Sequence, residues 1–304
     1  MKDFILKRLI GIITLVLCLS SAALGQQKVF FEQLPVPSGV QPSIDPSIPK
    51  ISWNRWTTKN FVIHSIDFDQ GEYLFNNIEH MKDWCFSRWG LPDIHFGAEC
   101  RIFCAPNVET MKKLFNLERS VGEVRIDKDG KLVISYLWLV LDGRPTEVIP
   151  PALTMVCLKE FNNQRYLNLG WWIYRGMSVL NESTNQIKIN VMLAGRTKSP
   201  FNIKTLFSTT EVEWKKFSQA DKQLFDAKAA MMCLMIRKEY GQKHFLYFLK
   251  FDNYEKDIKD YMGFDGFEKL NETFSRFVFN LANDVERNTT PDSYLHIEAI
   301  KQGG

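Results

Sequence analysis

The sequence has 304 residues and a formal net charge of +3, with 45% hydrophobic and 13% aromatic residues. This aromatic content indicates a folded chain rather than a disordered stalk, and the near-neutral charge gives no electrostatic footprint for nucleic acid or an anionic membrane. The length is enough for one large domain or for two small lobes that share a core.

The first 25 residues have the pattern of an export signal. A basic start precedes the apolar run Leu9–Leu19, which is short for a bilayer span, and the small residues Ala23 and Gly25 suit signal-peptidase cleavage. Lipid attachment at Cys18 and retention of the segment as an anchor are the two alternatives. Cleavage removes three basic residues and one acidic residue, which lowers the net charge from +3 to +1. We therefore expect an exported protein, periplasmic or extracellular, without a stable membrane span after cleavage.

Residues 26–50 form a proline-rich arm, and a globular pattern begins at Ile51. The arm contains five prolines and little periodicity, which predicts an extended chain. Alternation and turn residues then predict strands within 51–65 and at 99–104, 121–126 and 131–140, with helices at 71–89 and 108–115. His64 is a lone histidine in the first strand, and we interpret it as a packed imidazole rather than a ligand.

Helices are predicted for the rest of the chain. Two central helices, 152–161 and 172–181, are too apolar to lie exposed, so we expect them to touch and the first to pack on the sheet. The short β-branched run Ile187–Leu193 follows, and Phe201–Phe207 is interpreted as a loop over the core. Periodic segments at 221–240, 242–251 and 264–282 predict a helical last third, with Gly241 ending the first of them.

Cysteine usage does not predict a disulfide-rich scaffold. An odd number of cysteines remains after the signal, so at least one is unpaired. A single bridge, for example Cys85–Cys100, stays open as an alternative.

The two central helices resemble the active-site core of the gluzincin metallopeptidases, the peptidase MA-like families. In those enzymes a first helix carries His-Glu-x-x-His and a second carries Trp-Leu-x-Glu-Gly-Leu-Ala. The second helix here matches at five positions: Trp172, Ile173, Gly176, Met177 and Ser178. Arg175, however, stands where the family has its metal-binding Glu.

The first helix lacks the catalytic chemistry of the resembling enzymes. Its five motif positions are either 154–158 or 155–159, and neither register supplies a His or the catalytic Glu. Zinc catalysis of this class needs two imidazoles one helical turn apart, a third protein ligand and a carboxylate base. The resemblance therefore implies an α+β, zincin-like fold with no metal ligand, no cofactor and no catalytic residue. The degenerate cleft is expected to be lined by Thr154, Met155, Leu158, Lys159, Glu160, Trp172, Tyr174 and Arg175.

The resemblance also implies a domain organisation. One domain covers residues 51–283, with a sheet lobe at 51–183 and a mostly helical lobe at 184–283, and a C-terminal tail follows at 284–304. The strand Leu132–Val140 is the expected sheet edge above the cleft, where active members of the family hold peptide substrate by strand addition.

The expected function is that of an exported pseudopeptidase that binds a protein, a peptide or a cell-envelope component through the retained cleft. The alternative is a hydrolase that uses other residues. One route is nucleophilic attack by Cys157 with a histidine brought near by folding, the candidates being His80, His95 and His244. Another is a carboxylate metal site, which suits calcium better than zinc, with the candidates Glu147, Glu160 and Glu182.

The most specific structural prediction concerns the side chain of Arg175. The resemblance places its side chain in the cleft, where an unpaired cation is costly to bury. We expect a carboxylate partner, and Glu160 is favoured over Glu182 and Glu147 because it closes the facing helix and could form a bidentate pair. The alternative is an arginine that lies in water at the mouth of the cleft.

Overall fold

The computed structural model describes residues 29–30, 52–126, 132–165, 167, 169–198, 200–249 and 254–295. The predicted export signal, most of the proline-rich arm and the 127–130 turn lie outside the described residues. Within them, no helix is both long and apolar enough to cross a membrane.

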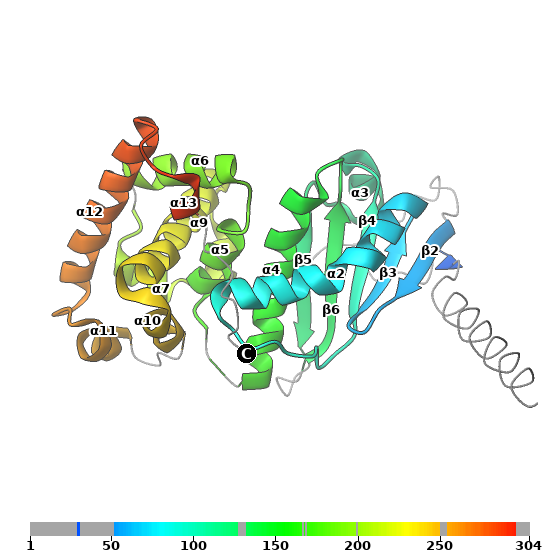
Figure 1. Ribbon diagram of the computed structural model, residues 1–304, viewed down its shortest axis with the longest axis horizontal. Coiled ribbons are helices and arrows are strands. Elements are labelled where there is room, and N and C mark those ends of the chain that lie inside the picture. The colour runs from blue at the N-terminus through cyan, green and yellow to red at the C-terminus, as the bar shows by residue number, and fades with distance from the viewer. Residues whose placement is uncertain are drawn as a thin grey trace, which may run out of the picture.

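One mixed sheet forms the core of the first half of the chain (Figure 1). Its strands follow the spatial order β1-β2-β3-β4-β6-β5, and the bounds are Val29–Phe30 (β1), Ser52–Thr57 (β2), Phe61–Ser65 (β3), Cys100–Ala105 (β4), Val121–Ile126 (β5) and Leu132–Val140 (β6). The strands β3, β4 and β6 are parallel, and the other neighbours are antiparallel. The predicted strands are therefore confirmed, as is an α+β fold class.

The expectation that Leu132–Val140 is the edge strand is wrong. β6 pairs with β4 on one side and with β5 on the other, so β5 is the edge of the described sheet. In the β5–β6 hairpin the second strand, β6, therefore lies between β4 and β5. β6 is a nine-residue strand whose side chains Tyr136 to Val140 are all buried, which suits a strand covered on both faces.

The two faces of the sheet are covered differently. On one face α2 (Phe68–Trp89) and α4 (Pro145–Arg165) pack on strand residues such as Ile63, Ile102 and Leu137. On the other face α3 (Val108–Phe115) covers a separate aromatic cluster that includes Trp53, Phe103 and Trp138. The strands thus alternate between two cores, as a pleated sheet requires.

His64 belongs to the second face and is packed, as predicted. Its ring stacks on Phe103 with centroids 4.9 Å apart. Burial and the positive charges of Arg55 and Arg101 lower the pKa of His64 to about 4, so the imidazole is neutral at physiological pH.

The ends of α2 show why this long helix starts and stops where it does. The Asp67 side chain accepts a hydrogen bond from the Gln70 N–H at 2.9 Å, which caps the N-terminus. Gly90 ends the helix with φ of 65°, a conformation that glycine adopts without a steric penalty. Both signals are local, which is why the sequence predicted this helix well.

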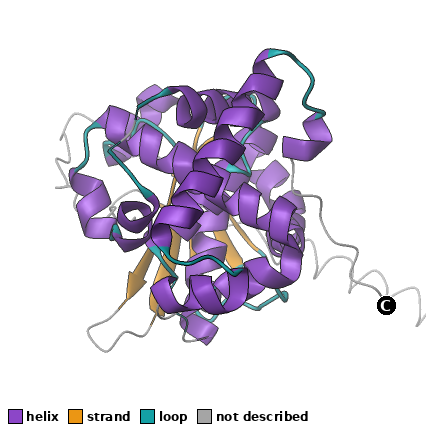
Figure 2. Ribbon diagram, turned by 90° about the vertical axis from the view of Figure 1, so that its left-hand side faces the viewer, coloured by secondary structure: helices purple, strands orange, loops and turns teal. Residues whose placement is uncertain are grey.

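The second half of the chain is helical (Figures 1 and 2). The helices are α5 (Trp171–Val179), α6 (Thr184–Arg196), α7 (Ile203–Ser208), α8 (Glu211–Lys216), α9 (Gln219–Met235), α10 (Gly241–Phe248), α11 (Tyr254–Met262), α12 (Phe267–Glu286) and α13 (Asp292–Leu295). α9 lies at the centre and is buried from Leu224 onward along its inner face. One continuous apolar cluster runs from Trp56 in the sheet to Leu295 in α13, so the two lobes share a core.

Several helical details differ from the expectations. The β-branched run Ile187–Leu193 lies inside α6, whose N-terminus is capped by the Ser183 side chain. Part of the expected loop Phe201–Phe207 is helix α7, and α11 was not predicted. The 221–240 helix is α9 followed by a π-helical turn at Ile236–Tyr240, labelled η2, and Gly241 follows with φ of 81°. The tail from residue 284 begins inside α12.

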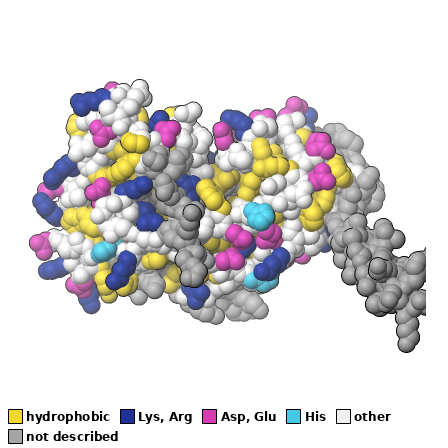
Figure 3. Space-filling model, in the orientation of Figure 1, with side chains coloured by type: hydrophobic (Ala, Val, Ile, Leu, Met, Phe, Trp, Pro, Cys, Tyr) yellow, Lys and Arg dark blue, Asp and Glu magenta, His cyan; other side chains and the backbone are white. Residues whose placement is uncertain are grey.

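All five cysteines in the described part of the chain are free and buried. The Cys85–Cys100 bridge that the sequence left open is therefore not formed. Cys85 instead lies against Thr154, with Sγ and Oγ1 3.6 Å apart. The face of the molecule shown in Figure 3 mixes acidic and basic side chains, as the near-neutral charge implies.

Candidate functional site

The two central helices lie at the junction of the lobes, as α4 and α5. α5 runs close to α9, because a Cβ atom at Gly176 would lie only 2.5 Å from the carbonyl oxygen of Ala229. Ser178 ties α5 to α4 by donating a hydrogen bond from Oγ to the Pro151 carbonyl at 2.8 Å. The expected contact between the two helices is confirmed. α5 is thus held between α4 and α9, and its polar side chains must find partners within this interface.

Most of the residues that were expected to line a cleft are instead buried in the protein core at this junction. Six of the eight are less than 9% exposed: Thr154, Met155, Leu158, Glu160, Trp172 and Tyr174. They pack the core beneath the junction rather than line an open cleft. Lys159 and Arg175 remain partly accessible, with side chains 17% and 15% exposed.

Arg175 forms a bidentate ion pair with Asp226 of α9. Arg175 Nε donates to Asp226 Oδ1 at 2.9 Å and Nη2 donates to Oδ2 at 2.5 Å. Trp214 of α8 completes the group, because its Nε1–H donates to Asp226 Oδ1 at 3.1 Å while its ring lies 4.6 Å from the Arg175 guanidinium carbon. Burial alone would lower the pKa of Arg175, but the charge and hydrogen bonds of Asp226 outweigh it and raise that pKa. The arginine is therefore fixed as a cation.

The expectation of a carboxylate partner is confirmed, but the partner is not Glu160. Glu160 accepts hydrogen bonds from Ser135 Oγ at 2.9 Å and from the Gly97 N–H at 3.1 Å, so its side chain is held by the sheet and the 97 loop. Burial raises the pKa of Glu160. The side chains of consecutive residues on an α-helix, such as Lys159 and Glu160, point in directions about 100° apart around the helix axis. Lys159 therefore meets the α8 side of the interface, while Glu160 turns to the sheet.

Further charges surround the Arg175–Asp226 pair. Lys159 Nζ lies 3.2 Å from Glu211 Oε2 at the start of α8 and 5.6 Å from the ring centroid of Trp171. The charges of Glu211 and Glu182 also act on Arg175. Arg119 also interacts electrostatically with Arg175, and Lys215 lies 3.0 Å from Glu211 Oε1 as a further cation at this junction. We refer to Lys159, Arg175, Arg119, Glu211, Asp226 and Glu182 as the charge network.

A polar cavity of about 420 Å³ gives solvent access to one side of the charge network. Arg119 and Glu182 line it, together with Glu147 at the start of α4. The Glu182 carboxylate accepts a hydrogen bond from Asn190 Nδ2 at 3.2 Å. Burial raises the pKa of Glu182 to about 7, against the opposing positive charge of Arg175. The pKa of Arg119 is lowered by partial desolvation at this rim and by the charge of Arg175.

The structure does not bring Cys157 together with any of the three histidines that were considered as its partner in nucleophilic catalysis. Cys157 is buried against Cys85, and burial raises the Cys157 pKa well above its ordinary value, which disfavours a thiolate nucleophile. His95 bonds Asn60, His244 bonds the Tyr240 carbonyl, and His80 is exposed on α2.

The three carboxylates that were considered for metal binding do not all meet. Glu147 and Glu182 line the same cavity, whereas Glu160 accepts a hydrogen bond from Ser135 of the sheet. In the part of the chain that the structure describes, no three His, Cys, Asp or Glu side chains are grouped so that they could hold a metal ion.

The sequence missed the partners that define the site: Arg119, Glu211, Trp214 and Asp226. Asp226 is 51 residues from Arg175, and nothing in the local pattern of α9 marks it as an ion-pair partner. The nearest available signal is that Asp226 lies in a mostly apolar part of α9, since buried acidic residues are usually paired. In comparisons with known proteins, no family model and no curated protein sequence matches this chain.

Proposed function

We propose that this chain is an exported, catalytically inactive relative of the gluzincin metallopeptidases, with a zincin-like fold, which binds a peptide, a protein or a cell-envelope component at the junction of its lobes. The observation that carries the proposal is the Arg175–Asp226 pair. By the resemblance of the second motif, Arg175 stands at the sequence position of the third zinc ligand, and Asp226 is its bidentate partner. A fixed cation there opposes binding of a metal cation.

The edge strand β5 supports a peptide or protein as the ligand. β5 is antiparallel to β6 and lies directly over α4, because a Cβ atom at Gly122 would lie 2.4 Å from the Ala152 carbonyl oxygen. The polar cavity includes Arg119 and Ser120, which lead into β5. An extended segment added to the β5 edge would start beside Arg119 and Ser120, and Glu182 lines the same cavity. Main-chain hydrogen bonds would supply affinity, and the cavity would supply selectivity.

A second candidate function is hydrolysis with Glu182 as a general acid–base. The observation in its favour is a carboxyl with a pKa near 7 in a cavity that solvent reaches, which is the range that suits proton transfer at neutral pH. The two serine hydroxyls that line this cavity, those of Ser120 and Ser183, accept hydrogen bonds from the backbone N–H groups of Val140 and Gln186, so we place binding first.

The test uses residues 26–304 and a pool of unstructured ten-residue peptides. Binding is measured by fluorescence anisotropy for the wild type, for Arg119→Gln and Glu182→Gln in the cavity wall, and for Arg287→Gln, an exposed control outside the cavity. We expect the two wall variants to weaken binding roughly tenfold, about 1.4 kcal/mol, and the control to leave it unchanged.

The same peptides are analysed by mass spectrometry after long incubation at pH 5.5 and pH 8, with and without a chelator. Intact peptides support the binding function. Cleavage that disappears in Glu182→Gln would establish the hydrolase instead. Equal binding by the wild type and both wall variants would contradict the cleft as the binding site.

A further inference from the structure

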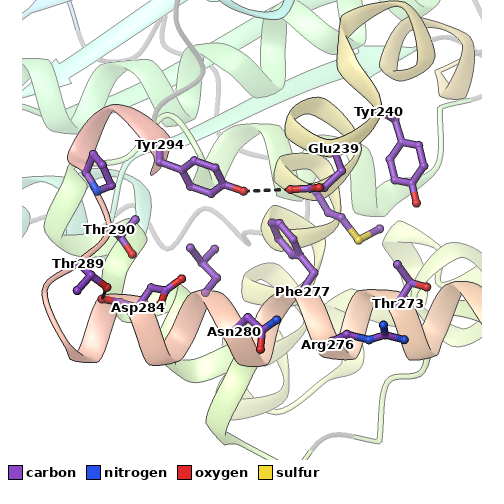
Figure 4. Close-up of a pocket in the computed structure, with 13 residues that line it drawn as sticks. Glu239, Tyr240, Thr273, Arg276, Phe277, Asn280, Asp284, Thr289, Thr290 and Tyr294 are labelled. Atoms are coloured by element: carbon purple, nitrogen blue, oxygen red, sulfur yellow. Dashed lines mark hydrogen bonds between the residues drawn. The ribbon is translucent and has the colours of Figure 1, made fainter.

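A second cavity, of about 410 Å³, lies in the helical lobe, away from the charge network (Figure 4). Three elements enclose it: the π-helical turn η2, one face of α12, and the segment that leads into α13. Its lining residues on α12 follow helical spacing from Thr273 to Asp284, so a single face of this helix forms one wall. Helices therefore form most of the cavity, and the 289–291 segment closes one side of it.

The floor of this cavity is apolar and its sides are aromatic. Met235 and Leu281 are buried beneath it, and Phe277 points between the helices (Figure 4). Tyr240 stands at one end and Tyr294 at the other. A floor of this kind holds the aliphatic or aromatic side chain of a small ligand, as is usual for small-molecule sites.

The π-helical turn places a carboxylate at the side of the cavity. Such turns are uncommon and occur often at functional sites. Glu239 lies within this one, and the Tyr294 hydroxyl donates a hydrogen bond to Glu239 Oε1 at 3.2 Å. Asp284 projects from α12 toward the same tyrosine (Figure 4). Burial and then the charges of Glu239 and Asp284 raise the pKa of Tyr294 to about 12, so both carboxylates act on the same phenol.

Arg276 places a cation at the end of the cavity that lies away from Asp284. Arg276 precedes Asp284 by eight residues, which places their Cα atoms ~12 Å apart along the helix axis. Neither side chain forms a salt bridge with another described residue. The charged residues that line the cavity are therefore one cation, Arg276, and two carboxylates, Glu239 and Asp284. Lys238 Nζ, which is not part of the lining, lies 5.2 Å from the ring centroid of Tyr294. The separation of Arg276 from the two carboxylates suits a ligand with an anion at one end and a cation at the other.

We propose that this cavity binds a short free peptide of two or three residues, with its ammonium group between Glu239 and Asp284 and its carboxylate at Arg276. An extended residue spans ~3.3–3.6 Å, so a tripeptide covers ~10 Å between its charged ends and matches the spacing along α12. The C-terminal end of α12 adds attraction for the ammonium through the helix dipole. The side chains of the peptide lie on Met235, Phe277 and Leu281. No residue of the charge network takes part, so the inference does not depend on the function proposed for the cleft.

The test compares one tripeptide in three chemical forms by isothermal titration calorimetry on residues 26–304. Ala-Phe-Ala with free ends, its N-acetyl form and its C-terminal amide differ only in the charges that the cavity is proposed to read. We expect the free peptide to bind and each blocked form to bind at least tenfold more weakly. Equal affinity for the three forms, or no binding of the free tripeptide, would overturn the proposal.

Matched variants assign each end of the peptide. In Glu239→Gln with Asp284→Asn the free and acetylated peptides should bind alike, while Asp284→Asn alone should narrow their difference, and in Arg276→Gln the free and amidated peptides should bind alike. Arg287→Gln, just beyond α12 and outside the cavity lining, should retain the wild-type preferences. Arg119→Gln should do the same, which separates this site from the cleft. Unchanged preferences in Glu239→Gln with Asp284→Asn and in Arg276→Gln would show that the peptide binds elsewhere.

Discussion

The junction of the lobes and the cavity on α12 use the same two residue types in opposite ways. Arg175 and Asp226 meet directly in a buried interface, with side chains 15% and 12% exposed. Arg276 and Asp284 are exposed, lie two helical turns apart on one helix and face a cavity. The first pair satisfies itself and holds α5 against α9, whereas the second pair leaves both charges available to a ligand. The paired charges therefore hold two helices together, whereas the separated charges are the basis of the peptide site that we propose on α12.

The largest expected effect comes from breaking the buried pair. Arg175→Ala strands Asp226 beside Trp214 and should lower the free energy of unfolding by ~3–5 kcal/mol. Replacing both partners, Arg175→Met with Asp226→Leu, should recover most of that loss, because an apolar pair leaves no uncompensated charge. Urea unfolding followed by far-UV circular dichroism measures both.

A matched double variant separates the observed partner from the one expected from sequence. Arg175→Ala with Glu160→Gln should show no recovery, since Glu160 is held by Ser135 and Gly97 rather than by Arg175. Recovery in that variant, together with none in Arg175→Met with Asp226→Leu, would contradict the pairing described above.

A smaller effect is expected at Gly176, which sets the distance between α5 and α9. An alanine Cβ there would lie 2.5 Å from the Ala229 carbonyl oxygen and 2.7 Å from Cys233 Sγ. The helix propensity gained by Gly→Ala, ~1 kcal/mol, opposes an overpacking cost of ~1–3 kcal/mol. Because the clash is with backbone, we expect net destabilisation of Gly176→Ala in thermal unfolding. Gly97→Ala is the control, since its Cβ meets nothing closer than 3.5 Å; equal stability of the two variants would mean that the helices can separate without cost.

Glu182 should make stability depend on pH. Its pKa is raised from an ordinary value of 4.5 to about 7, so the folded state holds the proton more tightly than the unfolded state. The stabilisation is therefore fully present below about pH 4.5 and is lost as pH rises through about 7. Between pH 5 and pH 8 the wild type should lose on the order of 1–2 kcal/mol relative to Glu182→Gln, which keeps a neutral side chain throughout. Parallel pH profiles for the two proteins would contradict a raised pKa.

The sequence predicted what local patterns determine. The capped helix α2, helix α3 and the alternating strands β3 and β4 all appear where their patterns placed them. The sequence also predicted that Arg175 has a carboxylate partner, since a cation on an apolar helix needs one. In each case the signal lies within a few residues, so a single sequence contains it.

What the sequence did not predict depends on contacts between distant segments. Which strand of the β5–β6 hairpin pairs with β4 depends on the direction in which the hairpin folds back. The choice of Asp226 over Glu160 depends on the rotation of α4, which turns Glu160 toward Ser135. No periodic pattern marks the π-helical turn at Ile236–Tyr240, and the cavity beside it is completed by α12, which is distant in sequence.

The smallest expected effect on stability completes the contrast between the two regions. Arg276→Gln and Asp284→Asn change exposed side chains that form no salt bridge within the described residues, so each should alter the free energy of unfolding by less than ~0.5 kcal/mol. The equivalent change in the junction, Asp226→Asn, replaces one half of a buried bidentate pair and should cost several times more, because Arg175 then lacks a counter-charge. Urea unfolding of the three variants side by side measures the difference. If Asp284→Asn proved as destabilising as Asp226→Asn, the cavity charges would serve the fold, and the distinction between a self-satisfied pair and a ligand-facing pair would fail.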